Sequence, residues 1–151
     1  MTRADVSEED LILDKQLCFA LYGASLAITR QYKPLLAPLN LTYPQYLAML
    51  VLWEQDGQPV KTLGARLGLD SGTLSPLLKR LEQSGYVKRQ RDDKDERKVT
   101  VSLTPQGAAL KEKALGVMAG IGKATGCSHE EMKALRDRLK ALRDHLEAAQ
   151  D

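Results

Sequence analysis

Two cysteines are the residues of this 151-residue chain best suited to covalent chemistry. Cys18 lies in a long apolar stretch of helical pattern, and Cys127 lies 109 positions further on, between a glycine and a serine. Their spacing matches no zinc-binding pattern, and a reducing cytosol disfavours a permanent disulfide. Because the thiolate is the reactive form of cysteine, the pair suggests a redox switch. The alternative interpretation is that Cys18 is a small core residue.

Positive charge is the second chemical feature of the sequence. The net charge of +2 is too small to indicate nucleic-acid binding by itself. Eight Lys or Arg and five acidic residues lie between Lys79 and Lys98, whereas the first 28 residues hold only two cations, Arg3 and Lys15. A concentrated basic segment is typical of a nucleic-acid-binding face, although a solvated surface would explain the charges taken alone.

Apolar periodicity predicts the elements that must position these residues. Pro44 is the expected first residue of the second helix, and Gly68 suits the end of the third. A cap at Asp70 or Ser71 is favoured for the fourth helix, although a cap at Thr73 would place Pro76 in the first turn. The expected helices span about 10–37, 44–55, 60–67, 70–84, 104 to beyond 121, and 128–149, with a turn at 56–59 and a hairpin of strands 86–91 and 98–103.

The short third helix, the fourth helix and the basic hairpin follow the order of a winged helix-turn-helix. The leucines at 74, 77, 78 and 81 form one stripe that would dock the fourth helix on the core and leave its other face for a DNA major groove. That free face carries Gly72, Thr73, Ser75, Pro76 and Lys79; phosphate contacts are expected from Lys79, Arg80, Lys88 and Arg89; and Arg97 is expected to enter a minor groove.

With these motifs in place, nearly the whole chain resembles the MarR family of transcription regulators. The most diagnostic piece is the wing, where Asp95, Glu96 and Arg97 fit the family's Asp-x-Arg pattern. The resemblance implies that Asp95 braces Arg97 for the minor groove. It also implies a homodimer, joined by the first and last helices, that binds a pseudo-palindromic operator in double-stranded DNA.

Cys18, Tyr22, Tyr32 and Tyr43 are further similar to the organic-hydroperoxide regulators (OhrR) within that family. The resemblance implies that an organic hydroperoxide oxidises Cys18 and that Tyr32 and Tyr43 donate hydrogen bonds to its sulfur. Cys127 matches the resolving cysteine of the two-cysteine branch. A sulfenic acid at Cys18 would then condense with Cys127 of the other chain, giving a reversible disulfide between subunits.

The position of Tyr32 constrains this sensor. Tyr32 follows Cys18 by 14 residues, which on one helix is about 21 Å at 1.5 Å per residue. A tyrosine at that distance cannot touch the cysteine of its own helix. If the contact exists, the tyrosine comes from the partner subunit, and the sensor spans the dimer interface.

The sequence thus predicts a mainly α fold with a small β-hairpin wing: six helices in a single domain over residues 1–151. The winged helix-turn-helix would occupy about 44–103, with dimerisation helices at about 10–37 and 104–149. Two rival functions stay open, a MarR regulator released by a small aromatic ligand with a structural Cys18, and a thiol peroxidase. We expect a cytoplasmic protein without a signal peptide, membrane span, metal or cofactor, and no Ser/His/Asp set indicates an enzyme.

Overall fold

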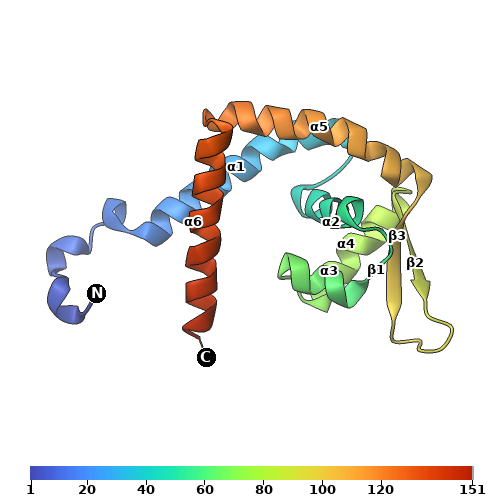
Figure 1. Ribbon diagram of the computed structural model, residues 1–151, viewed down its shortest axis with the longest axis horizontal. Helices are drawn as coiled ribbons and strands as arrows, with labels where there is room; N and C mark the ends of the chain where they lie inside the picture. Colours follow the sequence, from blue (N-terminus) through green and yellow to red (C-terminus); the bar gives the residue numbers. More distant parts are fainter. Residues whose placement is uncertain (151) are drawn as a thin grey trace.

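The computed structural model describes residues 1–150 and is mainly helical. Helices α1 and α5 run side by side across the top of the molecule, α6 descends at one end, and a compact lobe with the hairpin hangs from the other (Figure 1). The helices are α1 (Leu17–Leu36), α2 (Tyr43–Glu54), α3 (Val60–Leu67), α4 (Ser71–Gln83), α5 (Pro105–Thr125) and α6 (His129–Ala148). The strands are β1 (Gln58–Pro59), β2 (Val87–Arg91) and β3 (Val99–Leu103).

Local signals in the sequence set the helix ends as expected. Asp70 caps α4, since its carboxylate accepts the backbone N–H of Thr73 at 2.8 Å, and the helix accommodates Pro76 in its second turn. The earlier of the two predicted starts is therefore confirmed. Gly68 ends α3 with a φ of 66°, in the left-handed region that glycine occupies without a steric penalty. Thr104 caps α5 as predicted, directly before Pro105.

Three details differ from the sequence prediction. The first helix begins at Leu17 rather than near residue 10, because extended backbone at Ile12 and Gln16 flanks a 3-10 turn at Leu13–Lys15 and the side-chain amide of Gln16 donates to the carbonyls of Asp10 and Ile12. Helix α2 begins at Tyr43, so that Pro44 is its second residue. Part of the predicted turn at 56–59 is strand β1, which pairs with β3 in a sheet of order β1-β3-β2. That pairing is a long-range contact without a local signal.

The lobe is built around one hydrophobic core. All four leucines of the α4 stripe are buried, and α2 is buried on nearly every side, as its dense apolar sequence predicts. Two buried hydrogen bonds connect distant segments to this core. The indole N–H of Trp53 donates to the carbonyl of Gly107 in α5 at 3.0 Å, and the hydroxyl of Tyr86 donates to the carbonyl of Leu39 at 2.8 Å.

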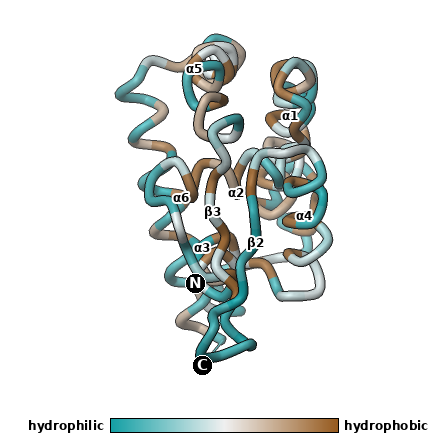
Figure 2. The backbone as a smooth tube through the Cα atoms, turned by 90° about the vertical axis from the view of Figure 1, so that its right-hand side faces the viewer, coloured by the Kyte–Doolittle hydropathy of each residue, from teal (hydrophilic) through white to brown (hydrophobic). Residues whose placement is uncertain are grey.

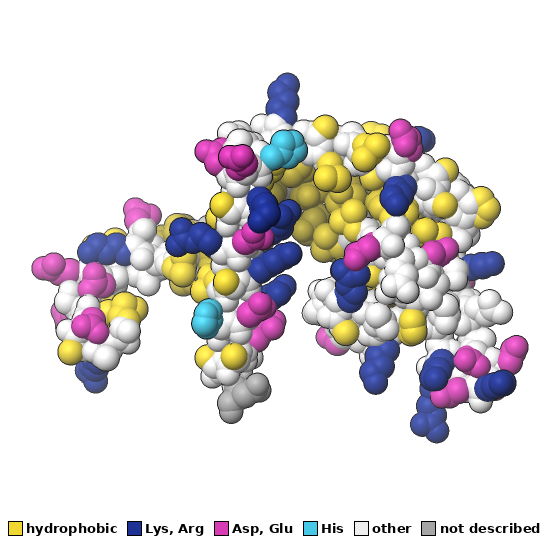
Figure 3. Space-filling model, viewed as in Figure 1, with side chains coloured by type: hydrophobic (Ala, Val, Ile, Leu, Met, Phe, Trp, Pro, Cys, Tyr) yellow, Lys and Arg dark blue, Asp and Glu magenta, His cyan; other side chains and the backbone are white. Residues whose placement is uncertain are grey.

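The long helices carry an apolar surface that the chain itself does not cover. On α6, Leu135, Leu139 and Leu146 are 54%, 40% and 57% exposed, and α6 has no buried residue. In Figure 3, hydrophobic side chains gather in the recess under α5 and α1, between α6 and the lobe. The tip of the hairpin is the opposite case, since Figure 2 shows it hydrophilic together with the adjoining part of β2.

No single helix within residues 1–150 is long and apolar enough to cross a membrane. The segments Leu17–Leu39 and Tyr43–Glu54 pass that test only as a pair, and they meet at 69°.

Candidate nucleic-acid interface and thiol site

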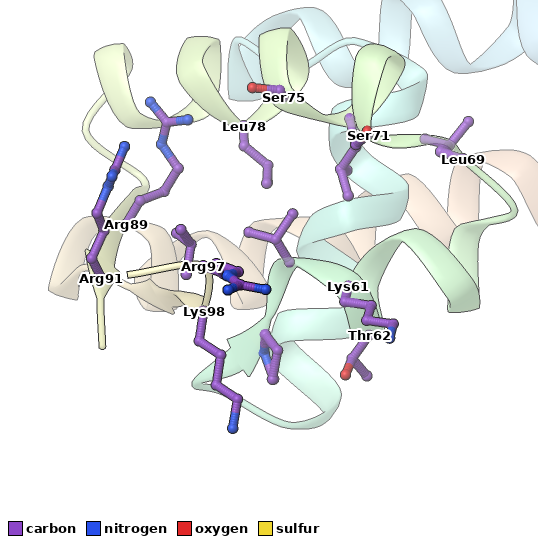
Figure 4. Close-up of a pocket in the computed structure, with 14 residues that line it drawn as sticks. Lys61, Thr62, Leu69, Ser71, Ser75, Leu78, Arg89, Arg91, Arg97 and Lys98 are labelled. Carbon is purple, nitrogen blue, oxygen red and sulfur yellow. The ribbon is translucent and has the colours of Figure 1, made fainter. Parts of the chain in front are cut away.

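A cationic hollow of about 780 Å³ lies between α3, α4 and the hairpin. Helix α4 supplies serine hydroxyls to one wall, and the hairpin supplies cations to the other (Figure 4). The polar residues of its lining are Lys61, Thr62, Ser71, Ser75, Arg89, Arg91, Arg97 and Lys98. Cations and hydroxyl donors from three separate elements can bind a phosphate backbone at several points at once.

The register of the hairpin decides which cations face this hollow. Arg89 pairs with Val101 and Arg91 pairs with Val99. Both arginines therefore lie on the same face of the sheet, the face that lines the hollow beside α4. Lys88 pairs with Ser102 and points to the opposite face, and it does not line the hollow. The predicted phosphate contacts of Lys88 and Arg89 therefore lie on different sides of the wing.

The predicted DNA-contacting residues of α4 also lie on different sides of that helix. Ser75 faces the hollow, whereas Gly72, Thr73, Pro76 and Lys79 are exposed on the rest of its surface. Arg80 lines a second cavity of about 890 Å³ with Lys33 and Tyr43, toward α1 and α2. The sequence prediction did not select Lys61, Thr62, Ser71, Arg91 and Lys98 as site residues. Arg91 and Lys98 belong to the basic run that signalled the site, but Lys61 and Thr62 carry no such signal.

The wing turn gives the predicted Asp95–Arg97 contact a specific form. The carboxylate of Asp95 accepts the backbone N–H of Arg97 at 3.1 Å, and its carbonyl accepts the N–H of Lys98 at 2.9 Å. Asp95 thus shapes the main chain of the turn that carries Arg97. The guanidinium of Arg97 stays available and reaches the rim of the hollow in Figure 4.

The two thiols lie at different places along the α1–α5 pair. Cys18 is exposed on the first turn of α1, and Cys127 is half-buried at the junction of α5 and α6. Cys18 is therefore not part of the hydrophobic core of the single chain. Within residues 1–150, no group of three His, Cys, Asp or Glu side chains could hold a metal ion.

Distance prevents the two cysteines of one chain from meeting in this conformation. Helices α1 and α5 run antiparallel, with Gly120 against the side chain of Leu35 (Figure 1). Cys127 follows Gly120 by seven residues and so lies about level with residue 28 of α1. Cys18 is ten residues further along α1, which corresponds to about 15 Å. A disulfide needs Cα atoms within roughly 7 Å.

Tyr32 and Tyr43 form a cluster, as their shared predicted role requires, and a third tyrosine joins them. The ring of Tyr32 lies 4.8 Å from that of Tyr43 and 5.6 Å from that of Tyr46, centroid to centroid. Burial, and secondarily the neighbouring phenols, raises the pKa of Tyr32 to about 12, and burial raises the pKa values of Tyr43 and Tyr46. A phenol is protonated at neutral pH, and the raised pKa values extend this state to higher pH, so that the three hydroxyls can act as hydrogen-bond donors.

Sequence reasoning missed Tyr46, because its apolar neighbours in α2 indicate core packing only. Tyr32 and Cys18 both belong to the continuous helix α1, which supports the estimate that they cannot touch within one chain. Among the hydrogen bonds of residues 1–150, only the hydroxyl of Tyr86 donates from a tyrosine side chain. The donors of Tyr32 and Tyr43 are thus available to a further group.

A helix-turn-helix with a basic wing and a cationic hollow defines a sequence-reading DNA-binding protein. Residues 30–114 match the family described as transcriptional regulator SarA/Rot. The chain is 54% identical over 127 residues to the organic hydroperoxide resistance transcriptional regulator of Bacillus subtilis, covering 82% of this chain and 84% of that protein. The chain therefore belongs to the MarR/SarA family of transcription regulators and is not an enzyme.

Solved structures agree with this assignment. AbfR is a protein of Staphylococcus epidermidis. Its reduced form bound to DNA matches with a TM-score of 0.76 and 37% identity over 93% of this chain and 99% of that chain. Disulfide-formed AbfR matches with a TM-score of 0.65 at 37% identity over 93% and 98%. MarR matches with a TM-score of 0.68 and 26% identity over 87% and 98%. The present conformation is thus closer to the DNA-bound form of AbfR than to its disulfide form.

Proposed function

We propose that this regulator is a peroxide-sensing repressor, released from its operator when an organic hydroperoxide oxidises Cys18. The observation that carries the proposal is an exposed thiol, Cys18, on the same helix as Tyr32, which it cannot reach within one chain and which clusters with Tyr43 of α2. The homologous regulator of Bacillus subtilis is named for organic hydroperoxide resistance. The function is exerted in the cytoplasm, where the DNA and the reducing thiol pool are found.

The proposed chemistry has two balanced steps. The thiolate of Cys18 attacks the outer oxygen of the hydroperoxide and breaks the O–O bond, leaving a sulfenic acid and, after protonation, an alcohol. The thiol of Cys127 from the partner subunit then attacks the sulfenic sulfur, forming the disulfide and releasing water. Leu17 and Phe19, 62% and 41% exposed beside Cys18, offer an apolar approach that favours an organic peroxide.

A homodimer completes the sensor in this proposal. The exposed apolar side chains of α6 and of α1 supply surface for a second copy. In such a dimer, Tyr32 and Tyr43 of one subunit can donate to Cys18 of the other, stabilising its thiolate. The same-chain separation of the thiols likewise favours a disulfide that crosses subunits.

For DNA binding, the proposal places α4 in the major groove and Arg97 in a minor groove, once per half-site of a pseudo-palindrome. The contacting set keeps Gly72, Thr73, Ser75, Pro76, Lys79, Arg80, Lys88, Arg89, Asp95 and Arg97, and it adds the newly identified lining residues of the hollow. Its support is the cationic hollow and the family match to regulators crystallised on DNA. Oxidation at the dimer interface would alter the spacing of the two winged helix-turn-helix lobes.

The test uses operator DNA selected from a random-sequence pool by the reduced protein. Cumene hydroperoxide should release the unaltered protein from this DNA and produce a dimer band on non-reducing gels, and dithiothreitol should reverse both. Cys18→Ser should stay bound at every dose. Cys127→Ser should still react but form no intersubunit bridge, ending over-oxidised or capped by a small thiol.

Mixing the two mutants provides the control for a bridge between subunits. A Cys18→Ser subunit paired with a Cys127→Ser subunit should form one disulfide per dimer. Release of DNA while mass spectrometry finds both cysteines free would sink the thiol switch and favour a regulator released by a small aromatic ligand. Many peroxide turnovers per subunit in a reductant-coupled assay would instead indicate a thiol peroxidase.

A further inference from the structure

Glu82, near the end of α4, contacts Arg89 of the wing through both of its carboxylate oxygens. One carboxylate oxygen accepts the backbone N–H of Arg89 at 3.3 Å. The other accepts the Nε–H of the same arginine at 3.0 Å and lies 3.0 Å from its terminal nitrogen. A single side chain therefore holds both the main chain and the guanidinium of one β2 residue.

The sheet topology explains why this contact is needed. Strand β2 lies at the edge of the three-stranded sheet, where alternate backbone amides have no strand partner. The Arg89 amide is satisfied by Glu82 instead. Arg89 also stands opposite the fully buried Val101, on the core-facing side of the wing. A guanidinium at this half-buried position requires a counter-charge, which Glu82 provides.

We propose that Glu82 is a positioning residue for DNA recognition, which fixes the wing to the recognition helix and aims Arg89 into the cationic hollow. The inference rests on DNA binding by this fold and not on the peroxide chemistry. Arg89 lines the hollow with Arg91 and Arg97, so the brace holds a phosphate-binding cation at a set distance from α4. The carboxylate is an unfavourable charge near DNA, and its geometric role offsets that cost.

This role predicts an unusual signature, because removal of the carboxylate has two opposing effects. Loss of an acid near the hollow raises affinity for any DNA, whereas loss of the brace lowers affinity only where α4 and the wing must fit their grooves together. Affinity for non-specific DNA should therefore rise while the ratio of specific to non-specific affinity falls. A purely electrostatic role raises both affinities, and a purely structural role lowers both together with the melting temperature.

The experiment compares Glu82→Ala with Glu82→Gln, which change the charge equally while only Gln keeps an acceptor oxygen. Affinities are measured for the pool-selected operator and for a scrambled duplex of the same length. Glu82→Ala should lower the ratio of specific to non-specific affinity by about tenfold, and Glu82→Gln should recover part of that loss. Asp93→Asn, at the wing tip outside the hollow, is the charge-matched control and should leave the ratio unchanged.

Amide hydrogen exchange gives a second measurement that does not depend on DNA. The Arg89 amide should exchange about tenfold faster in Glu82→Ala than in the unaltered dimer, with core amides such as that of Leu78 unchanged. An unchanged affinity ratio in Glu82→Ala, or equal protection of the Arg89 amide, overturns the proposal. If the unaltered protein selects no operator, sequence-specific regulation is contradicted instead. The exchange measurement then tests by itself whether Glu82 holds Arg89 in place.

Discussion

Gly107, in the first turn of α5, is the position where we expect an added methyl group to destabilise the contact between the wing and the long helices most. A Cβ added there would lie 2.8 Å from the carbonyl carbon of Tyr86 and closer still to its oxygen. That oxygen is held in place because it accepts the N–H of Thr104. On the other side, the indole of Trp53 holds the carbonyl of Gly107 itself. Neither backbone segment can move without breaking a hydrogen bond.

We expect Gly107→Ala to lower the free energy of unfolding by about 3 kcal/mol, near the upper end of overpacking costs, because the clash is with backbone rather than with a flexible side chain. For a chain of this length, that loss corresponds to a fall in melting temperature of roughly 6–12 °C. The measurement is thermal and urea unfolding of the reduced protein. Operator affinity, measured well below the melting temperature, should also fall, since the start of β2 is pushed away from α5.

Gly116→Ala on the same helix is the matched control. Its added Cβ meets nothing within 4 Å, so the substitution should stabilise the helix by up to about 1 kcal/mol through the lower conformational entropy of the unfolded chain. The two variants make the same chemical change with opposite expected signs. A melting temperature for Gly107→Ala equal to that of the parent would refute the claim that α5 and Tyr86 are in rigid contact.

Three further outcomes are expected. Tyr86→Phe removes the buried hydrogen bond to Leu39 and should cost about 1.5 kcal/mol in urea unfolding, without changing the rate at which peroxide consumes the reactive thiol; an unaltered unfolding midpoint would contradict it. Arg97→Ala should weaken operator binding by at most a few kcal/mol in fluorescence anisotropy, and equal affinity would remove Arg97 from the interface. Ultraviolet titration should find Tyr32 ionising near pH 12, with its contribution to stability complete below about pH 10 and lost as the pH rises toward 12, because the folded state favours the neutral phenol. Absence of that late step in the parent, or its persistence in Tyr32→Phe, would contradict the burial of this ring.

Much of the fold followed from local signals in the sequence. The caps at Asp70 and Thr104, and the glycine after α3, act through contacts within a few residues, so their positions are readable without the fold. The leucine stripe of α4 was equally legible, because burial of one helix face leaves a periodic pattern. The prediction was wrong at the start of α1 and at β1, where a 3-10 turn with extended flanking residues and a long-range strand pairing outweighed the pattern.

The candidate site separates what the sequence indicates from what only the tertiary structure decides. Helix order and charge density in the sequence were enough to indicate a DNA-binding wing, whereas the link between the two thiols and the tyrosines came from the resemblance to a known family. Only the tertiary structure decided that Arg89 and Arg91 face the hollow while Lys88 does not, since that choice depends on strand register. It also decided the partner of Arg89 and the separation of the two thiols along α1 and α5. These properties depend on which distant segments pack together, and a one-dimensional pattern does not record that packing.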